Sequence, residues 1–303
     1  MFRMRSAAPE ARLEQGSFPA EFAQKIDFET DVITIPVRLC NLPPFSAIAS
    51  RALAMTTDSD VDLRQFSELI GGDPAFTSDV LFLANSSLFG FPSHMHSLRH
   101  AVALLGLDRI KSLAVTVAMR SFLDKPNSLV HQCWQHSVAC AVICEEISGI
   151  FDLPADCAYT AGIMHDIGRL GFLKSYPTEM NKVLTGQHLN TQAVLQAERE
   201  ALSVDHASAG SWLIGHWALP KDFSEVCKHH HDAPSARDSD ILQLVKAGCH
   251  IADAIGFPAV KCHQQPSYLE ARSLISVRLG RQAKFPAEDL QRNVTVRLAA
   301  FES

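Results

Sequence analysis

Histidine and aspartate side chains recur inside apolar stretches between positions 136 and 253. In chain order they are His136, the pair His165-Asp166, His206, two members of the run His229-His230-His231, and Asp253. A polar group is normally excluded from such stretches unless it has a partner. Imidazoles and carboxylates are the groups that hold one or two divalent metals in buried sites. The order His, His-Asp, His, His-His, Asp therefore predicts a metal centre.

Such a centre would suit hydrolysis of a phosphoester, because a bound metal lowers the pKa of water from about 15.7 towards about 7. Neighbouring side chains on a helix point about 100° apart. His165 and Asp166 can therefore hold one metal, or bridge two, only near a helix end or with ligands from other helices. Arg169, one turn beyond Asp166, is a candidate for holding a phosphate oxygen, and a solvent-facing arginine is the alternative. Lys174 is a weaker candidate, with an ordinary surface lysine as its alternative.

Each candidate ligand also has a structural interpretation. His136 would be a hydrogen-bonded core histidine, and His165-Asp166 a structural hydrogen-bonded pair. The run 229–231 would be a solvated helix end, where histidine suits the helix dipole. Asp253 is hardest to explain in this way, because a buried carboxylate needs a partner. Seven further histidines lie outside this pattern, and we interpret them as structural or exposed: His94, His96, His100, His188, His216, His250 and His263. Of these, His250 is the first candidate for a role in the site, because it lies one turn before Asp253.

Composition is typical of a globular protein. Of 303 residues, 47% are hydrophobic and 20% charged, and the net charge of −6 disfavours nucleic-acid binding, which usually needs a basic face. No apolar run approaches the roughly 20 residues of a membrane helix, and the first fifteen residues have no apolar core of the secretory type. Eight cysteines without a CxxC motif indicate free thiols in a reducing cytoplasm. Cys133, Cys140 and Cys144 share the predicted helix of His136, and binding of a soft metal is their weaker alternative.

Apolar residues repeat every three or four positions from Phe28 onward, which predicts an all-α fold. Helices are expected to begin at Asp73-Pro74 and at Ser97, to end at Gly106, and to run unbroken over Ala155–Leu170. The break at 124–127 (Asp-Lys-Pro-Asn) is the best internal boundary. We expect a polar lead-in over 1–27, an N-terminal helical part over 28–125, a metal-binding helical part over 126–260 and a C-terminal helical extension over 261–303.

Several short motifs together resemble a known family. They are Leu42-Pro43-Pro44, Asp73-Pro74, Leu83-Ala84-Asn85-Ser86, Ala103-Leu104-Leu105-Gly106, Trp134-Gln135-His136-Ser137, Ala158-Tyr159, Gly162-Ile163-Met164-His165-Asp166-Ile167-Gly168, His216-Trp217-Ala218-Leu219-Pro220 and His229-His230-His231. Over roughly Phe28 to Phe257 the chain resembles the bacterial HDOD domain, a signalling relative of the HD metal-dependent phosphohydrolases. The resemblance implies an all-helical fold, in which an N-terminal helical subdomain packs on an HD-like core. It also implies a role in two-component or cyclic-dinucleotide signalling.

Most HDOD domains look degenerate at the metal positions, whereas this chain is more similar to HD-GYP phosphodiesterases there. The resemblance implies that Asp166 matches the aspartate that bridges the metals in two-metal relatives. A donor set of histidine and carboxylate suits one or two ions of iron, manganese, zinc, nickel or cobalt. Two departures matter: a ligand glutamate of some relatives is Gln132 here, and the glycine-tyrosine-proline loop is missing after His231. The implied metal ligands are His136, His165, Asp166, His206, His230, His231 and Asp253.

Two functions follow as expectations. The first is a regulatory output or adaptor module that keeps its metal and binds a signalling protein or a nucleotide or phosphate ligand. The second is an active metal-dependent phosphohydrolase, in which Asp166 and Arg169 take part in catalysis. We expect no nucleic-acid or membrane partner, and the sequence leaves formation of a homodimer open.

Overall fold

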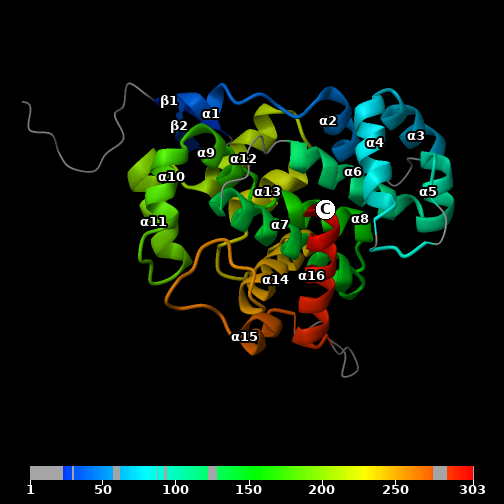
Figure 1. The fold of residues 1–303 in the computed structure, drawn as a ribbon. Helices are drawn as coiled ribbons and strands as arrows, with labels where there is room; N and C mark the ends of the chain where they lie inside the picture. The colour runs from blue at the N-terminus through cyan, green and yellow to red at the C-terminus, as the bar shows by residue number, and fades with distance from the viewer. Residues whose placement is uncertain are drawn as a thin grey trace, which may run out of the picture.

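The structure is a computed structural model that describes residues 23–28, 31–56, 62–86, 88–91, 94–121, 128–275 and 285–302. Helices dominate, and the predicted all-α class is confirmed (Figure 1). Among the helices of these residues, none combines the length and the apolar character that crossing a membrane requires. Of the expected lead-in, residues 1–22 lie outside the described part.

A two-stranded antiparallel hairpin precedes the helices. Strand β1 (Ala23–Phe28) pairs with β2 (Asp31–Pro36), so that Ala23 lies opposite Pro36 and Phe28 opposite Asp31. The sequence predicts no strand here. Residues 32–35 read Val-Ile-Thr-Ile, which favours a strand. The run is too short to stand out against the helical spacing that follows it.

Polar caps set the ends of the N-terminal helices, as the sequence predicts. The carboxylate of Asp73 accepts hydrogen bonds from two backbone N–H groups at the start of α4, and the Ser97 hydroxyl accepts one at the start of α5. Gly106 ends α5 with a φ of 86°, a conformation that glycine adopts without strain. This part comprises α1 (Val37–Cys40), α2 (Ala47–Met55), α3 (Leu63–Gly71), α4 (Pro74–Ala84), α5 (Leu98–Leu105) and α6 (Leu107–Ser121).

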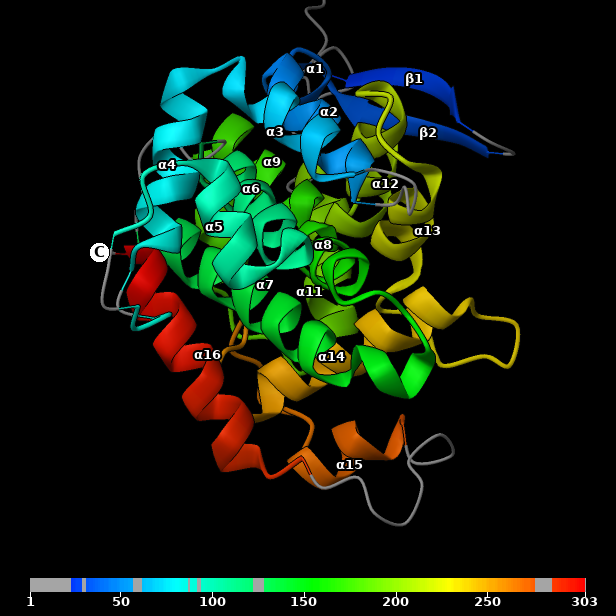
Figure 2. The same ribbon diagram turned by 90° about the vertical axis from the view of Figure 1, so that its right-hand side faces the viewer.

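The long helix α7 (Ser128–Ile147) lies at the centre of the second part. It packs against α8, α14 and α16, and α16 runs along the outside of the molecule (Figure 2). The remaining elements are η2 (Ser148–Phe151), α8 (Ala155–Met164), α9 (Ile167–Ser175), α10 (Pro177–Leu184), α11 (Thr191–Leu202), α12 (His206–His216), α13 (Lys221–His229), α14 (Asp240–Ala254), α15 (Tyr268–Ser273) and α16 (Ala287–Glu302).

The expected single helix over Ala155–Leu170 is wrong, because the chain breaks between α8 and α9 at His165 and Asp166. Gly168, in the first turn of α9, packs against the backbone of α12. A Cβ atom there would lie 2.0 Å from the carbonyl oxygen of His206. Redirecting the chain at this point brings α9 against α12. It also turns the side chains of His165 and Asp166 into the interior from a helix junction.

One apolar core runs through both helical parts. Buried polar contacts also join them: Lys111 Nζ lies 3.1 Å from Asp156 Oδ2, and the hydroxyls of Thr116 and Tyr159 are 2.7 Å apart. The expected boundary at 124–127 lies outside the described residues. The division into four segments therefore stays a prediction, but the described parts share one interior.

Candidate metal centre

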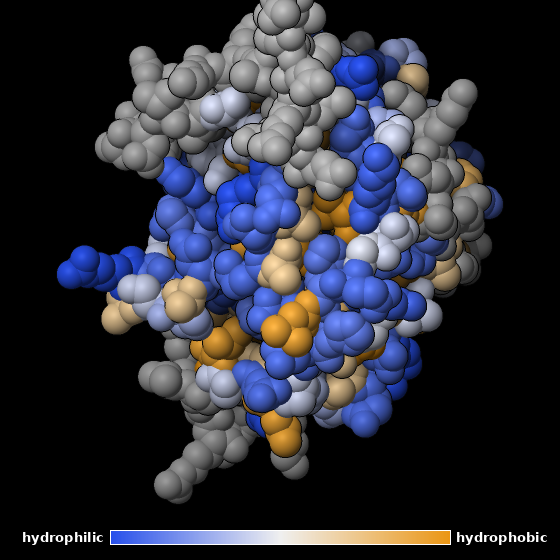
Figure 3. Space-filling model, turned by 90° about the vertical axis from the view of Figure 1, so that its left-hand side faces the viewer, coloured by the Kyte–Doolittle hydropathy of each residue, from blue (hydrophilic) through white to orange (hydrophobic). Residues whose placement is uncertain are grey.

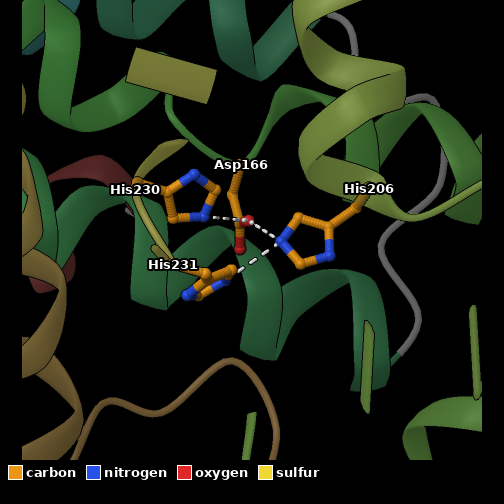
Figure 4. A group of neighbouring side chains, drawn as sticks. All are labelled: Asp166, His206, His230 and His231. Atoms are coloured by element: carbon orange, nitrogen blue, oxygen red, sulfur yellow. Dashed lines mark hydrogen bonds and ion pairs between the residues drawn. The ribbon is translucent and has the colours of Figure 1, made fainter. Parts of the chain in front are cut away.

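Four of the predicted ligands converge in the interior. Asp166 comes from the α8–α9 junction, His206 from the first residue of α12, and His230 and His231 from the end of α13 (Figure 4). His206 Nε2 lies 3.1 Å from both Asp166 Oδ1 and His231 Nε2, and His230 Nε2 lies 3.6 Å from Asp166 Oδ1. Atoms about 2.0–2.2 Å from one shared metal stand about 3–3.5 Å apart. The four side chains have the spacing of a metal's ligands.

The hydrogen bond at the outer nitrogen of a histidine ring shows whether the nitrogen that faces the centre carries a proton. His230 Nδ1 lies 2.8 Å from the carbonyl oxygen of Cys227, which can only accept, so Nδ1 carries the proton and Nε2 is a bare acceptor in the neutral ring. His230 Nε2 is buried and forms no hydrogen bond within the described residues, while Asp166 Oδ1, 3.6 Å away, has His206 Nε2 as an ion-pair partner at 3.1 Å. A bare ring nitrogen that faces a carboxylate oxygen is poorly stabilised without a cation between them. The donor set fits a divalent metal.

Glu198 sets the orientation of His206. Its Oε2 lies 2.6 Å from His206 Nδ1 and accepts a hydrogen bond from the His206 backbone N–H, so the Nε2 edge faces Asp166. Burial and Arg169 lower the pKa of His206, but Glu198 and Asp166 outweigh them and raise it to about 9. Without a metal, His206 is therefore protonated, and its positive charge lies between the carboxylates of Glu198 and Asp166. A carboxylate behind a ligand histidine is a common second layer of metal sites.

A second group of donors lies beside the first. His136 Nε2 is 3.2 Å from His165 Nε2 and 3.6 Å from the sulfur of Cys249, and all three side chains are buried. Burial lowers the pKa of His136 to about 4 and that of His165 well below its ordinary value. Both rings are therefore neutral at physiological pH, which is the form that binds metals.

Asp253, the predicted closing carboxylate, belongs to neither donor group. Its Oδ1 lies 3.3 Å from His136 Nδ1, the ring nitrogen that also contacts the Phe257 carbonyl oxygen at 2.8 Å. Burial raises the pKa of Asp253 to about 8. In this arrangement Asp253 holds the back of the His136 ring, and the role of direct ligand stays a prediction.

Arg169 is buried, which rules out the interpretation as a solvent-facing arginine. Its guanidinium donates to Asp166 Oδ2 at 2.5 Å and lies 3.6 Å from Glu198 Oε1. Burial raises the pKa of Asp166, but Arg169 and His206 outweigh it and hold this pKa well below its usual range. One carboxylate oxygen of Asp166 thus faces the donor group while the arginine holds the other.

The other polar residues considered from the sequence lie outside both groups. His188 contacts the carbonyl oxygen of Val183, His216 stacks on Trp212, and His229 pairs with Asp232 near the surface. The exposed histidines at or before the start of α5 are His94, His96 and His100, and an outer cleft is lined by His250 and His263. Lys174 is half-buried. The buried cysteines of α7 are Cys133, Cys140 and Cys144.

Two residues of the site were missed in the sequence. Cys249 lies one turn before Asp253 on α14, a spacing that places both side chains on one helix face. Glu198 is a fully buried glutamate that stands between the buried Val194 and Leu202 at four-residue spacing on α11. Both spacings were usable signals, because each places a polar or sulfur-bearing side chain on the buried face of its helix.

Two cavities of different size adjoin the donors. The inner one has a volume of about 20 Å³ and is lined by His136, Arg169, His231, Cys249 and Asp253, among others. Pockets that bind small molecules measure about 300–1,000 Å³, so the inner cavity can hold water or an ion but no larger ligand. The outer cleft has a volume of about 740 Å³ and shares His231 and Thr191 with the inner cavity.

Residues 42–233 match the HDOD domain profile, which covers more than half of the chain. The chain belongs to the HDOD family. An uncharacterised protein of Treponema pallidum (strain Nichols) is 26% identical over 230 residues, which is 75% of this chain but 42% of that protein. The HDOD chain therefore spans about two-fifths of the length of the curated relative that it matches.

Solved structures show the same fold. An HDOD domain protein of unknown function from Geobacter sulfurreducens superposes with a TM-score of 0.66 at 21% identity, covering 86% of this chain and 96% of that one. A protein of Shewanella amazonensis SB2B, provisionally named a phosphohydrolase, gives a TM-score of 0.65 at 18% identity over 88% and 96%. At these identities the comparison carries the fold alone.

Gln132, one turn before His136 on α7, has a structural task. Its side-chain amide donates to the carbonyl oxygens of Pro258 and Ala259, at 3.1 and 3.0 Å. The amide therefore holds the segment after α14 against α7, beside His136. A carboxylate at this position would face two carbonyl oxygens without a proton to share.

Proposed function

We propose that this HDOD protein is a regulatory output module that keeps an HD-type metal centre in its interior and does not turn over a phosphoester. The observation that carries the proposal is the size of the space at the donors. A cavity of about 20 Å³ is far smaller than the roughly 300–1,000 Å³ of small-molecule pockets and excludes a phosphoester. In addition, Arg169 holds the second oxygen of Asp166, the atom that would be needed to bridge two ions.

The metal belongs to the group of iron, manganese, zinc, nickel and cobalt, because the donors are imidazoles and a carboxylate. We infer one or two ions, with the first held by Asp166, His206, His230 and His231. The proposed partner is a signalling protein or a nucleotide or phosphate ligand. Cytoplasmic location is part of the proposal, and the free state of all eight cysteines suits it.

A metal-dependent phosphohydrolase is the second candidate. Its supporting observation is that His231 and Thr191 line both the inner cavity and the outer cleft, whose volume of about 740 Å³ accepts a nucleotide. A metal would lower the pKa of bound water towards about 7 there. In that case Arg169 would exchange Asp166 for a phosphate oxygen, because a guanidinium binds either group.

Turnover by the metal-loaded full chain separates the two candidates. The protein is loaded with manganese, iron or zinc and incubated with cyclic dinucleotides, linear nucleotides and phosphomonoesters, beside the Asp166→Ala variant treated identically. The proposal predicts equal, background rates for both proteins. Hydrolysis by the parent that Asp166→Ala abolishes would overturn the regulatory proposal in favour of the enzyme.

A further inference from the structure

The group formed by His136, His165 and Cys249 has the geometry of a second coordination site. His136 Nδ1 faces the Phe257 carbonyl oxygen at 2.8 Å, and His165 Nδ1 faces the Gly162 carbonyl oxygen at 2.6 Å. A carbonyl can only accept, so both Nδ1 atoms carry the protons and both Nε2 atoms are bare.

The two bare nitrogens lie 3.2 Å from each other in the interior. The thiol of Cys249 can donate its single proton to His136 Nε2, 3.6 Å away. His165 Nε2 then receives no hydrogen bond and faces the lone pair of His136 Nε2. A cation between the three atoms would satisfy all of them. The inner cavity, lined by His136 and Cys249, opens at this place.

Two of the three separations match tetrahedral coordination. With metal–nitrogen bonds of about 2.05 Å and a metal–sulfur bond of about 2.3 Å, tetrahedral angles set two nitrogens about 3.3 Å apart and nitrogen and sulfur about 3.6 Å apart. The corresponding distances here are 3.2 Å between the two Nε2 atoms and 3.6 Å from His136 Nε2 to the sulfur. The third pair, His165 Nε2 and the sulfur, lies within 4.8 Å, so a modest side-chain shift is enough to complete the three-ligand set.

We propose that Cys249 is a metal ligand and that it forms, with His136 and His165, a thiolate-bearing second site next to the Asp166 group. As the sulfur–metal bond forms, the thiol loses its proton to solvent. Asp253 holds His136 from behind through Nδ1 and is a positioning residue. Soft sulfur favours zinc, or iron and cobalt in their divalent states, over manganese and magnesium at this site. The inference rests on the proposed metal centre.

Cobalt(II) binding to the full chain tests the assignment, because a thiolate ligand adds a sulfur-to-cobalt charge-transfer band in the near ultraviolet. We expect the band in the parent and in Cys140→Ser, and its loss in Cys249→Ser. Cys140 is the matched control: it is also a buried thiol, and its sulfur lies 3.9 Å from that of Cys144. Bound cobalt is counted in the same samples.

Cobalt that binds without the band, or a band that survives Cys249→Ser, would overturn the cysteine assignment and leave the metal centre standing. No bound cobalt in the parent would overturn both. X-ray absorption of the zinc-loaded parent covers the case of a variant that does not fold. It should show a sulfur neighbour at about 2.3 Å beside nitrogen at about 2.0 Å, and a shell of nitrogen and oxygen alone would contradict the proposal.

Discussion

The tautomers of the buried histidines decide what the interior of this protein can bind. Four imidazoles carry the Nδ1 proton towards a fixed acceptor and turn Nε2 inward: His136, His165, His206 and His230. A hydrogen-bonded core histidine, the structural alternative for a lone His136, needs a donor for its second nitrogen. The Cys249 thiol at 3.6 Å can serve His136 Nε2, but His165 Nε2 then faces an unprotonated nitrogen and His230 Nε2 has no hydrogen-bond partner within the described residues. Here the inward nitrogens face each other and a carboxylate, which is the arrangement that a cation stabilises.

Glu198→Gln should weaken metal binding about 10–100-fold, because a neutral amide no longer raises the basicity of His206 or fixes its ring as strongly. The matched control is Glu200→Gln on the same helix, an exposed glutamate that bonds Gln196 and does not touch the site. Isothermal titration with zinc measures both variants against the parent. Equal affinities of Glu198→Gln and the parent would show that Glu198 is not part of the centre.

Much of the first donor group could be predicted from residue types and order, since histidine and aspartate in apolar helices stand out. The positions of Arg169 and Asp253 could not. Whether an arginine one turn from a carboxylate points inward depends on whether packing leaves it a buried partner, here Asp166 and Glu198. The face of His136 that Asp253 meets depends on the path of α14 past α7.

The junction between α8 and α9 positions the central pair of the site. A continuous helix over Ala155–Leu170 is what local propensity favours, and it would send His165 and Asp166 in directions about 100° apart. The tight contact between Gly168 and the start of α12 breaks it instead. Tertiary packing thus overrides helix propensity at the junction, which is where the donors require a break. Sequence spacing alone does not show this break.

Gly168→Ala should destabilise the fold by about 3 kcal/mol or more, because the new methyl group would overlap the backbone of α12 and neither chain can move without disturbing the site. Gly149→Ala is the control, since a Cβ atom there meets nothing within 4 Å. It should change stability by about 0.5 kcal/mol or less. Urea unfolding measures both, and equal midpoints would contradict the close packing that we describe.

The whole molecule combines a shared core with an open cleft beside the centre. Buried polar pairs such as Lys111 with Asp156 tie the N-terminal helices to the second part. On the face that carries α10 and α11, hydrophobic side chains appear in separate spots among hydrophilic ones (Figure 3). Scattered apolar residues of this kind are ordinary on a protein surface.

The central claim is that the buried donors hold a metal. Elemental analysis of protein purified without chelator, beside the Asp166→Ala variant, tests it most directly. The account predicts one or two equivalents of iron, manganese, zinc, nickel or cobalt in the parent and a clear loss in the variant, because Asp166 supplies the only carboxylate oxygen of the described donor groups. A parent that is empty, and stays empty after reconstitution with these metals, would contradict the account.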